Sequence, residues 1–192
     1  MNINSNQILL QKELFQIQSH SYKPVFPSTR YQGSKNKIAD WIVDSTKNMS
    51  FTTVLDAFGG TGSIGYAFKK NGKQIFYNDY LKFNYIIGLA LIENNFVTLD
   101  DNDINFILNK HSSISYPSLI QDNFQDIYFT DEENKWLDQT IANIKLLKNK
   151  YKKAIALFAL FQSCIIKRPY NLFHRKNLYV RTVELNRSFG NK

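Results

Sequence analysis

Two carboxylates and a glycine-rich turn are the residues of this chain with the clearest chemical potential. Asp56 ends a β-branched apolar run that begins at Phe51, and Asp79 follows a second apolar run. The segment between them predicts a strand, a turn, a helix and a second strand over residues 51–80. Both carboxylates should therefore lie at one edge of a sheet, where a carboxylate after the second strand usually accepts from a ribose diol.

The turn contains Gly59, Gly60 and Gly62, and Gly65 follows one helical turn later. Glycine permits positive φ angles and leaves room for a ligand where a Cβ atom would lie. The spacing Gly60-x-Gly62-x-x-Gly65 also satisfies the dinucleotide fingerprint. The turn thus predicts a nucleotide cofactor without selecting which one, and a turn that only packs a helix on a strand is the alternative without a ligand.

A short upstream segment, Arg30-Tyr-Gln-Gly-Ser-Lys35, leads into a predicted helix that Ser34 can cap. Lys35 falls in the first turn of this helix, where a cation is unfavourable against the helix dipole. This position indicates a nearby anion, either a ligand carboxylate or an acidic side chain, and a solvated lysine is the alternative. The apolar residues that follow at helical spacing are Ile38, Trp41 and Ile42.

The rest of the chain is predicted to be mainly helical. Thr130 and Glu133 form a capping box before one helix, and the acidic cluster that begins at Asp100 caps another in preference to forming a metal loop. Residues 111–126 are predicted to be irregular. The predicted helices cover residues 1–20, 83–96, about 100–110, about 131–150 and 154–166, and a short strand covers residues 178–183.

Composition places the chain among globular proteins. Of 192 residues, 43% are hydrophobic and 21% charged, which suits one domain, or one domain with an appendage. The longest apolar run, residues 154–166, is too short to span a membrane, and no secretory signal precedes it. Cys164 is predicted to be a small buried hydrophobe, and no paired metal ligands or catalytic nucleophile are recognised. These features predict a cytoplasmic protein.

Positive charge is concentrated in the C-terminal part. The net charge is +8, yet residues 150–192 contain ten basic residues and one acidic residue, so that the first 149 residues are close to neutral. Cations alternating with aromatic and amide side chains can neutralise phosphates and stack on bases, which predicts DNA as partner, with a solvated basic loop as the alternative. The predicted DNA contacts are Lys167, Arg168, Tyr170, Asn171, His174, Arg175 and Lys176.

Three segments taken together, Arg30–Lys35, Asp56–Ser63 and Asn78–Tyr80, resemble the Dam-like N6-adenine DNA methyltransferases. The resemblance implies S-adenosylmethionine as cofactor. Asp56 would accept from its ammonium group and Asp79 from its ribose hydroxyls. The cofactor-binding residues that the resemblance implies are Tyr31, Lys35, Asp56, Phe58, Gly60, Gly62, Ser63, Asp79 and Tyr80.

One hallmark of that family is missing from the chain. These enzymes carry a D/N-P-P-Y/F/W motif that binds the target adenine, whereas Lys167-Arg-Pro-Tyr170 shares only the Pro-Tyr pair. No residue is therefore assigned as catalytic. Because only two strong strands precede residue 100, we expect an α/β fold with a partial Rossmann-like methyltransferase sheet and a mainly helical C-terminal DNA-recognition segment.

The leading hypothesis is the cofactor-binding portion of a DNA adenine-N6 methyltransferase, split or truncated before its D-P-P-Y motif. Residues 1–99 would form the S-adenosylmethionine-binding part and residues 100–192 the basic DNA-contacting part, with a complementary chain supplying the motif. A second hypothesis is a non-catalytic DNA-binding or regulatory protein derived from a methyltransferase. A third is an NAD-dependent oxidoreductase, which rests on the glycine spacing alone.

Overall fold

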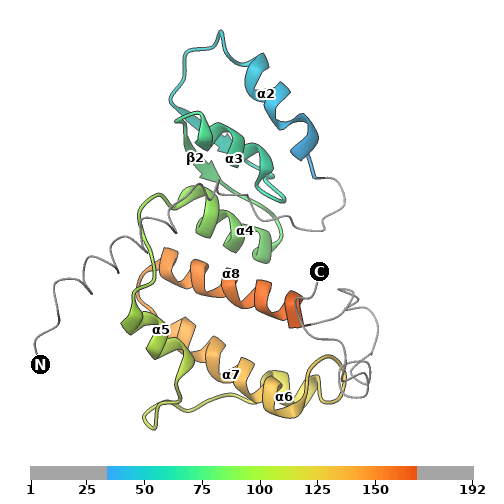
Figure 1. Cartoon of the computed structure of the whole chain (residues 1–192), viewed down its shortest axis with the longest axis vertical. Coiled ribbons are helices and arrows are strands. Elements are labelled where there is room, and N and C mark those ends of the chain that lie inside the picture. Colours follow the sequence, from blue (N-terminus) through green and yellow to red (C-terminus); the bar gives the residue numbers. More distant parts are fainter. Residues whose placement is uncertain (1–33, 168–192) are drawn as a thin grey trace, which may run out of the picture. The chain divides into compact units, whose positions relative to one another are not determined.

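The computed structural model describes residues 34–167, which form a small parallel sheet and a series of helices (Figure 1). The predicted helix over residues 1–20 and strand over residues 178–183 lie outside the described residues. The elements are η1 (Asn36–Ile38), α2 (Ala39–Ser45), β1 (Thr53–Asp56), α3 (Ser63–Lys70), β2 (Gln74–Tyr77), α4 (Lys82–Gly88), η2 (Leu89–Glu93), α5 (Asp101–Leu108), α6 (Leu119–Asn123), α7 (Asp131–Leu146) and α8 (Lys150–Lys167).

The predicted strand, turn, helix and strand are confirmed. Strands β1 and β2 pair in parallel, with Thr53 opposite Gln74 and Asp56 opposite Tyr77, and α3 connects them. A parallel pair needs such a crossover, because a tight turn would reverse the chain direction. Both strands consequently end at the same edge of the sheet.

The two faces of the sheet differ in burial. Ile75 and Tyr77 are buried on one face, where Gly65 of α3 approaches Ile75 closely. On the other face, Leu55 and Phe76 lie opposite each other and are 68% and 50% exposed. The sheet therefore has one packed face and one open apolar face.

The predicted helix over residues 83–96 is interrupted by a wider turn. Helix α4 ends at Gly88 and continues as η2, a π-helix in which the N–H of Asn94 donates to the carbonyl of Leu89 at 3.2 Å. Ile87 and Ala90 are buried. The apolar pattern shows the inward face of this segment but not the extra residue in its last turn, which changes the direction of the side chains beyond it.

Helix α7 stabilises its neighbours with buried polar side chains. Its own start has the predicted capping box between Thr130 and Glu133. Asp138 accepts hydrogen bonds from the N–H groups of Ile120 and Gln121 at the start of α6. Helix α6 lies in the region predicted to be irregular. Its first turn is capped by a side chain of another helix and not by its own residues, so no local sequence pattern indicates it.

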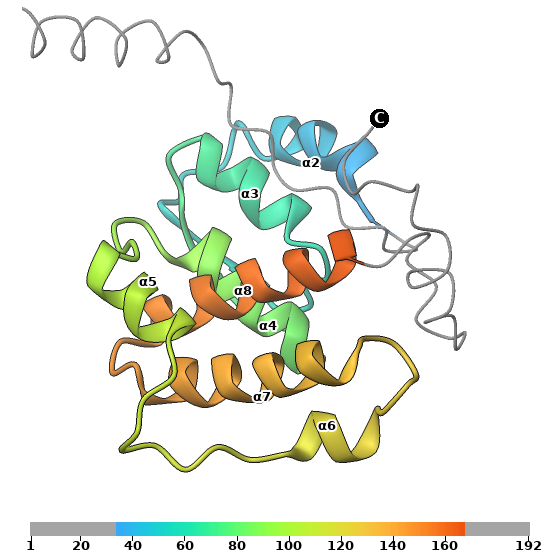
Figure 2. The same ribbon diagram turned by 60° about the horizontal axis from the view of Figure 1, so that its bottom comes forward.

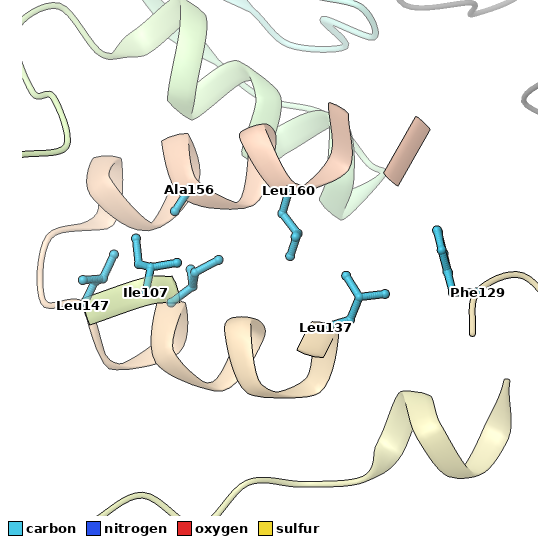
Figure 3. Close-up of a cluster of buried hydrophobic side chains, with 7 residues drawn as sticks. Ile107, Phe129, Leu137, Leu147, Ala156 and Leu160 are labelled. Atoms are coloured by element: carbon cyan, nitrogen blue, oxygen red, sulfur yellow. The ribbon is translucent and has the colours of Figure 1, made fainter. Parts of the chain in front are cut away.

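Helix α8 lies between α4 and α7 (Figures 1 and 2). Its Ala154 packs against Leu89 and Ala90, while Ala156 and Leu160 face α7. Figure 3 shows Leu160 and the facing Leu137 of α7 in this second cluster. The helix predicted over residues 154–166 is therefore present, and its middle is packed on two sides. Ile166 near its end is exposed, and Cys164 is half-buried against the α7 cluster.

The predicted inward stripe of α2 is wrong. Ile38 and Trp41 are exposed, while Ala39 and Val43 are buried. The reason is that a short 3₁₀ turn precedes α2, so that the helix begins at Ala39 and its buried face is shifted by one residue. Ser34 does not cap α2, although its hydroxyl accepts from the N–H of Asn36 at 3.4 Å.

The acidic residues at the start of α5 cap that helix. Asp100 and Asp103 form a reciprocal capping box at the start of α5, which confirms the predicted capping role of this acidic cluster. Within residues 34–167, no three His, Cys, Asp or Glu side chains are grouped so that they could hold a metal ion. No helix in the same range is both long and apolar enough to cross a bilayer.

Candidate functional site

The turn between β1 and α3 requires glycine at two positions. Gly60 has φ 55° and Gly62 has φ 76°, both in the left-handed region that side chains with a Cβ atom disfavour. The N–H of Gly62 donates to the carbonyl of Gly59 at 2.8 Å, which closes the turn. The predicted conformational role of these two glycines is therefore present in the structure.

Gly59 and Gly88 are required for a different reason, the close approach of the Tyr77 ring. A Cβ atom added at Gly59 would lie 2.0 Å from a ring carbon of Tyr77, and one at Gly88 would lie 1.9 Å from another. The Tyr77 hydroxyl donates to the carbonyl of Gly60 at 2.7 Å. Tyr77 thus supports the turn through its ring and its hydroxyl group. Its position in the sequence does not indicate this role.

The third glycine of the fingerprint spacing has a packing role. A Cβ atom at Gly65 would lie 2.8 Å from Ile92 of η2, and the Gly65 N–H donates to Asp56 Oδ2 at 3.1 Å. Gly65 therefore lets α3 pack closely against η2 and brings the helix to the Asp56 carboxylate. This spacing is explained without a dinucleotide.

Asp56 lies at the end of β1 and is half-buried. Burial raises the pKa of this carboxyl group above its ordinary value, and the hydrogen bond from Gly65 and the charge of Lys35 oppose the shift. The charge of Asp79 adds to the increase. Lys35, the N-cap residue of η1, therefore acts electrostatically on an acidic side chain, one of the two kinds of anion that its sequence position indicates.

Asp79 follows β2 and accepts three hydrogen bonds. Its Oδ1 atom accepts from the Leu81 N–H at 2.9 Å and from Asn84 at 3.1 Å, while Oδ2 accepts from the Gly60 N–H at 2.7 Å. Partial burial raises the pKa of Asp79, but these bonds outweigh it and lower the pKa below its ordinary value. Among the described residues Oδ2 receives one hydrogen bond, so it keeps a second acceptor position for a ligand hydroxyl.

Three hydroxyl groups meet beside the turn. Thr61 and Ser63 are buried, with their oxygens 2.8 Å apart, and the Ser34 oxygen lies 3.4 Å from Thr61 and 3.3 Å from Ser63. This cluster joins the segment that contains Lys35 to the start of α3. Ser63 belongs to the predicted set, whereas Ser34 and Thr61 are added by the structure.

The predicted aromatic residues are open to solvent. Phe58 is 77% exposed and Tyr80 is 90% exposed, and each follows a strand end within a few residues of Asp56 or Asp79. Asn84 is buried in the first turn of α4 and donates a hydrogen bond to Asp79, and it is not among the predicted site residues. A polar residue on the inward side of a predicted helix, five positions after Asp79, is the sign that could have indicated it.

The structure brings Lys35, Asp56, Asp79 and the glycine turn together at one edge of the sheet. Tyr31 lies outside the described residues, and so do most of the predicted DNA contacts. Lys167 is the last residue of α8, and its side chain is not among those described. The remaining predicted DNA contacts outside the described range are Arg168, Tyr170, Asn171, His174, Arg175 and Lys176.

A family model of the D12 class N6 adenine-specific DNA methyltransferases matches residues 31–188. The match covers most of the chain, so the chain belongs to this family, which confirms the resemblance seen in its motifs.

Several type II methyltransferases are similar to the chain. M2.HphI of Haemophilus parahaemolyticus is 37% identical over 150 residues, which are 78% of this chain and 44% of that protein. M.NlaIII of Neisseria lactamica is 28% identical over 62% of this chain and 38% of its own length, and M.FokI of Planomicrobium okeanokoites is 29% identical over 64% and 21%. The chain thus spans less than half the length of each relative. No solved structure matches it.

Proposed function

We propose that this chain is the S-adenosylmethionine-binding portion of a site-specific DNA adenine-N6 methyltransferase. The observation that carries the proposal is the meeting of Asp56, Asp79 and the Gly59–Gly62 turn at one sheet edge, with the charge of Lys35 acting on Asp56. Membership of the D12 class family supports this cofactor over NAD.

The residues present suit S-adenosylmethionine, which would supply an electrophilic methyl group. The Asp56 carboxylate would accept from the ammonium of the methionine part, and Asp79 Oδ2 would accept from a ribose hydroxyl, which its free acceptor position supports. Gly60 and Gly62 let the backbone come close to a ligand, since they carry no Cβ atom. The exposed rings of Phe58 and Tyr80 offer apolar surface for the adenine.

Residues 100–192 are proposed to contact DNA, and residues 1–99 to form the cofactor part. The excess of basic over acidic residues from position 150 onward supports this division, because phosphate contacts dominate DNA affinity. The relatives are type II methyltransferases, which supports a restriction-modification context. Since the proposed substrate is DNA, the cytoplasm is the proposed place of action.

A complementary chain or segment is proposed to complete the active site. The chain has four prolines and no two are adjacent, so a D-P-P-Y motif has to come from elsewhere. The exposed Leu55 and Phe76 on the open face of the sheet support a further layer packed on that face, and a sheet of only two described strands supports further strands at its edges. The two strands would then be part of a larger Rossmann-like sheet.

The chain alone is expected to bind S-adenosylmethionine and not NAD. Isothermal titration calorimetry and thermal shift with each cofactor test this, and methylation of adenine in DNA should appear only after addition of a chain with a D-P-P-Y motif. Equal responses to both cofactors, or no response to S-adenosylmethionine with or without the complementary chain, would overturn the proposal. DNA binding without any methylation in the completed system would favour the non-catalytic regulatory protein.

Cofactor affinity is expected to fall as the solution is acidified. Only the ionised form of Asp56 can pair with an ammonium group, and burial raises its pKa above the ordinary value of 3.8. The loss should therefore begin at a higher pH than for an ordinary carboxyl group, while Asp79, with its lowered pKa, stays ionised. Dissociation constants measured from about pH 7 down to about pH 4 check this. A flat profile over this whole range would remove Asp56 from the ammonium contact.

A further inference from the structure

Glu93, the last residue of the π-helix η2, joins three elements through one carboxylate. Its Oε2 atom accepts from the backbone N–H of Tyr77 in β2 at 3.3 Å. Its Oε1 atom accepts from Lys150 Nζ at 3.2 Å and from the Tyr151 hydroxyl at 3.3 Å, both in the first turn of α8. The Glu93 side chain is 18% exposed, whereas its partner Lys150 is 59% exposed, so the contacts with Tyr77 and Tyr151 are the more buried ones.

The contact with Tyr77 is made on the outer side of the sheet. The N–H of Asn78 donates toward β1, to the carbonyl of Asp56 at 2.9 Å. Because successive N–H groups of a strand point in opposite directions, that of Tyr77 points away from β1, where Glu93 receives it. Glu93 thus provides the acceptor that a neighbouring strand would otherwise provide.

Tyr77 connects Glu93 to the glycine turn, because its backbone contacts Glu93 and its side chain contacts the turn. Its ring fits closely against Gly59 and Gly88, and its hydroxyl donates to the carbonyl of Gly60 at 2.7 Å. The N–H of Gly60 in turn donates to Asp79 Oδ2 at 2.7 Å. A continuous set of contacts therefore runs from the first turn of α8, through Glu93 and Tyr77, to the residues proposed to hold the cofactor.

We propose that Glu93 is a positioning residue for cofactor binding, which acts through Tyr77 and makes the glycine turn sensitive to the position of α8. The proposal rests on the function proposed above for this turn. The π-helix gives it a structural basis, because a wider last turn sets the direction of Glu93, and such turns occur frequently at functional sites. Since α8 leads directly into the predicted DNA contacts, any effect of DNA on the cofactor affinity should be matched by an equal effect of the cofactor on the DNA affinity.

A test on the full chain without cofactor uses the amide NMR resonances of Gly60 and Gly62. Glu93→Gln and Tyr151→Phe should both shift these resonances. The matched control is Lys152→Met, which removes ion pairs between α8 and the residues Asp100 and Asp103 at the start of α5 but does not touch Glu93 or Tyr77. This control should leave both glycine resonances in place.

A second test measures the dissociation constant for S-adenosylmethionine by calorimetry. Glu93→Gln and Tyr77→Phe should each weaken binding about three- to tenfold, because each removes or weakens one hydrogen bond in the series. If Glu93 acts through Tyr77, the double variant should bind more tightly than the product of the two single effects predicts. Lys152→Met should stay within about twofold of the wild-type chain.

The outcomes separate this inference from the proposed function. Unchanged glycine resonances and an unchanged dissociation constant in Glu93→Gln would overturn the inference alone, and so would equal effects in the Lys152→Met control. If the wild-type chain fails to bind S-adenosylmethionine although the resonances respond, the proposed function fails and Glu93 remains only a structural link. Should Glu93→Gln not fold, Tyr151→Phe, which removes a single hydroxyl, decides the same question.

Discussion

Gly88→Ala is expected to lower the free energy of unfolding by about 3 kcal/mol, although alanine is the better helix former. Gly88 has helical angles, so an added methyl group alone would favour the helix by at most about 1 kcal/mol. That methyl group would lie 1.9 Å from a ring carbon of Tyr77, and the buried ring has Gly59 against it as well. The ring therefore has no nearby position into which it can move.

Thermal unfolding followed by circular dichroism measures this effect. For a chain of this length, about 3 kcal/mol corresponds to a decrease in Tm of roughly 6–12 °C. Gly72→Ala is the control, because nothing lies within 4 Å of its added Cβ atom and only its φ of 74° opposes the change. A Gly88→Ala variant within about 2 °C of the wild type would show that the ring is not confined. Adding Tyr77→Leu to Gly88→Ala should restore part of the loss.

Asp56→Asn is expected to weaken S-adenosylmethionine binding about 10- to 100-fold without lowering stability. A hydrogen bond to a charged group contributes about 1.5–3 kcal/mol, and asparagine keeps the shape but not the charge. The effect on folding has the opposite sign. Because the pKa of Asp56 is raised by folding, its ionised form lowers the stability at neutral pH, and that contribution disappears in the variant.

Calorimetry and thermal unfolding of the same preparation separate these two effects. Asp44→Asn is the matched control. Asp44 of α2 is an exposed carboxylate that pairs with Lys47 at 2.8 Å, so its replacement should not affect the dissociation constant. A loss of affinity together with an equal loss of Tm in Asp56→Asn would mean that the residue only supports the fold. Unchanged affinity would remove it from the cofactor site.

Local sequence patterns predicted the parts of the fold that depend on neighbouring residues. The apolar runs before Asp56 and Asp79, the left-handed Gly60 and Gly62, and the capping boxes at Asp100 and Thr130 each involve residues close together in the chain. For the same reason, the two carboxylates could be assigned to one sheet edge before the structure was known.

Features that depend on contacts between residues far apart in the chain could not be predicted from local sequence patterns. Helix α6 is capped by Asp138 from α7, and Gly59 and Gly88 both make room for the ring of Tyr77. The phase of α2 was missed because one 3₁₀ turn displaces the helix start by a few residues. Glu93 accepts a hydrogen bond from the N–H of Tyr77, 16 positions away in the chain, and no spacing rule connects these two residues.

The lysines at the start of α8 alter the electrostatic field around this helix. Lys150 and Lys152 lie where the helix dipole disfavours positive charge, yet carboxylates of Glu93, Asp100 and Asp103 pair with them. Much of the positive charge at this end is therefore locally compensated, whereas the basic residues from position 167 onward follow the other end of the helix in the sequence. An approaching polyanion would thus be turned toward one end of the segment, so that the charge pattern guides orientation as well as attraction.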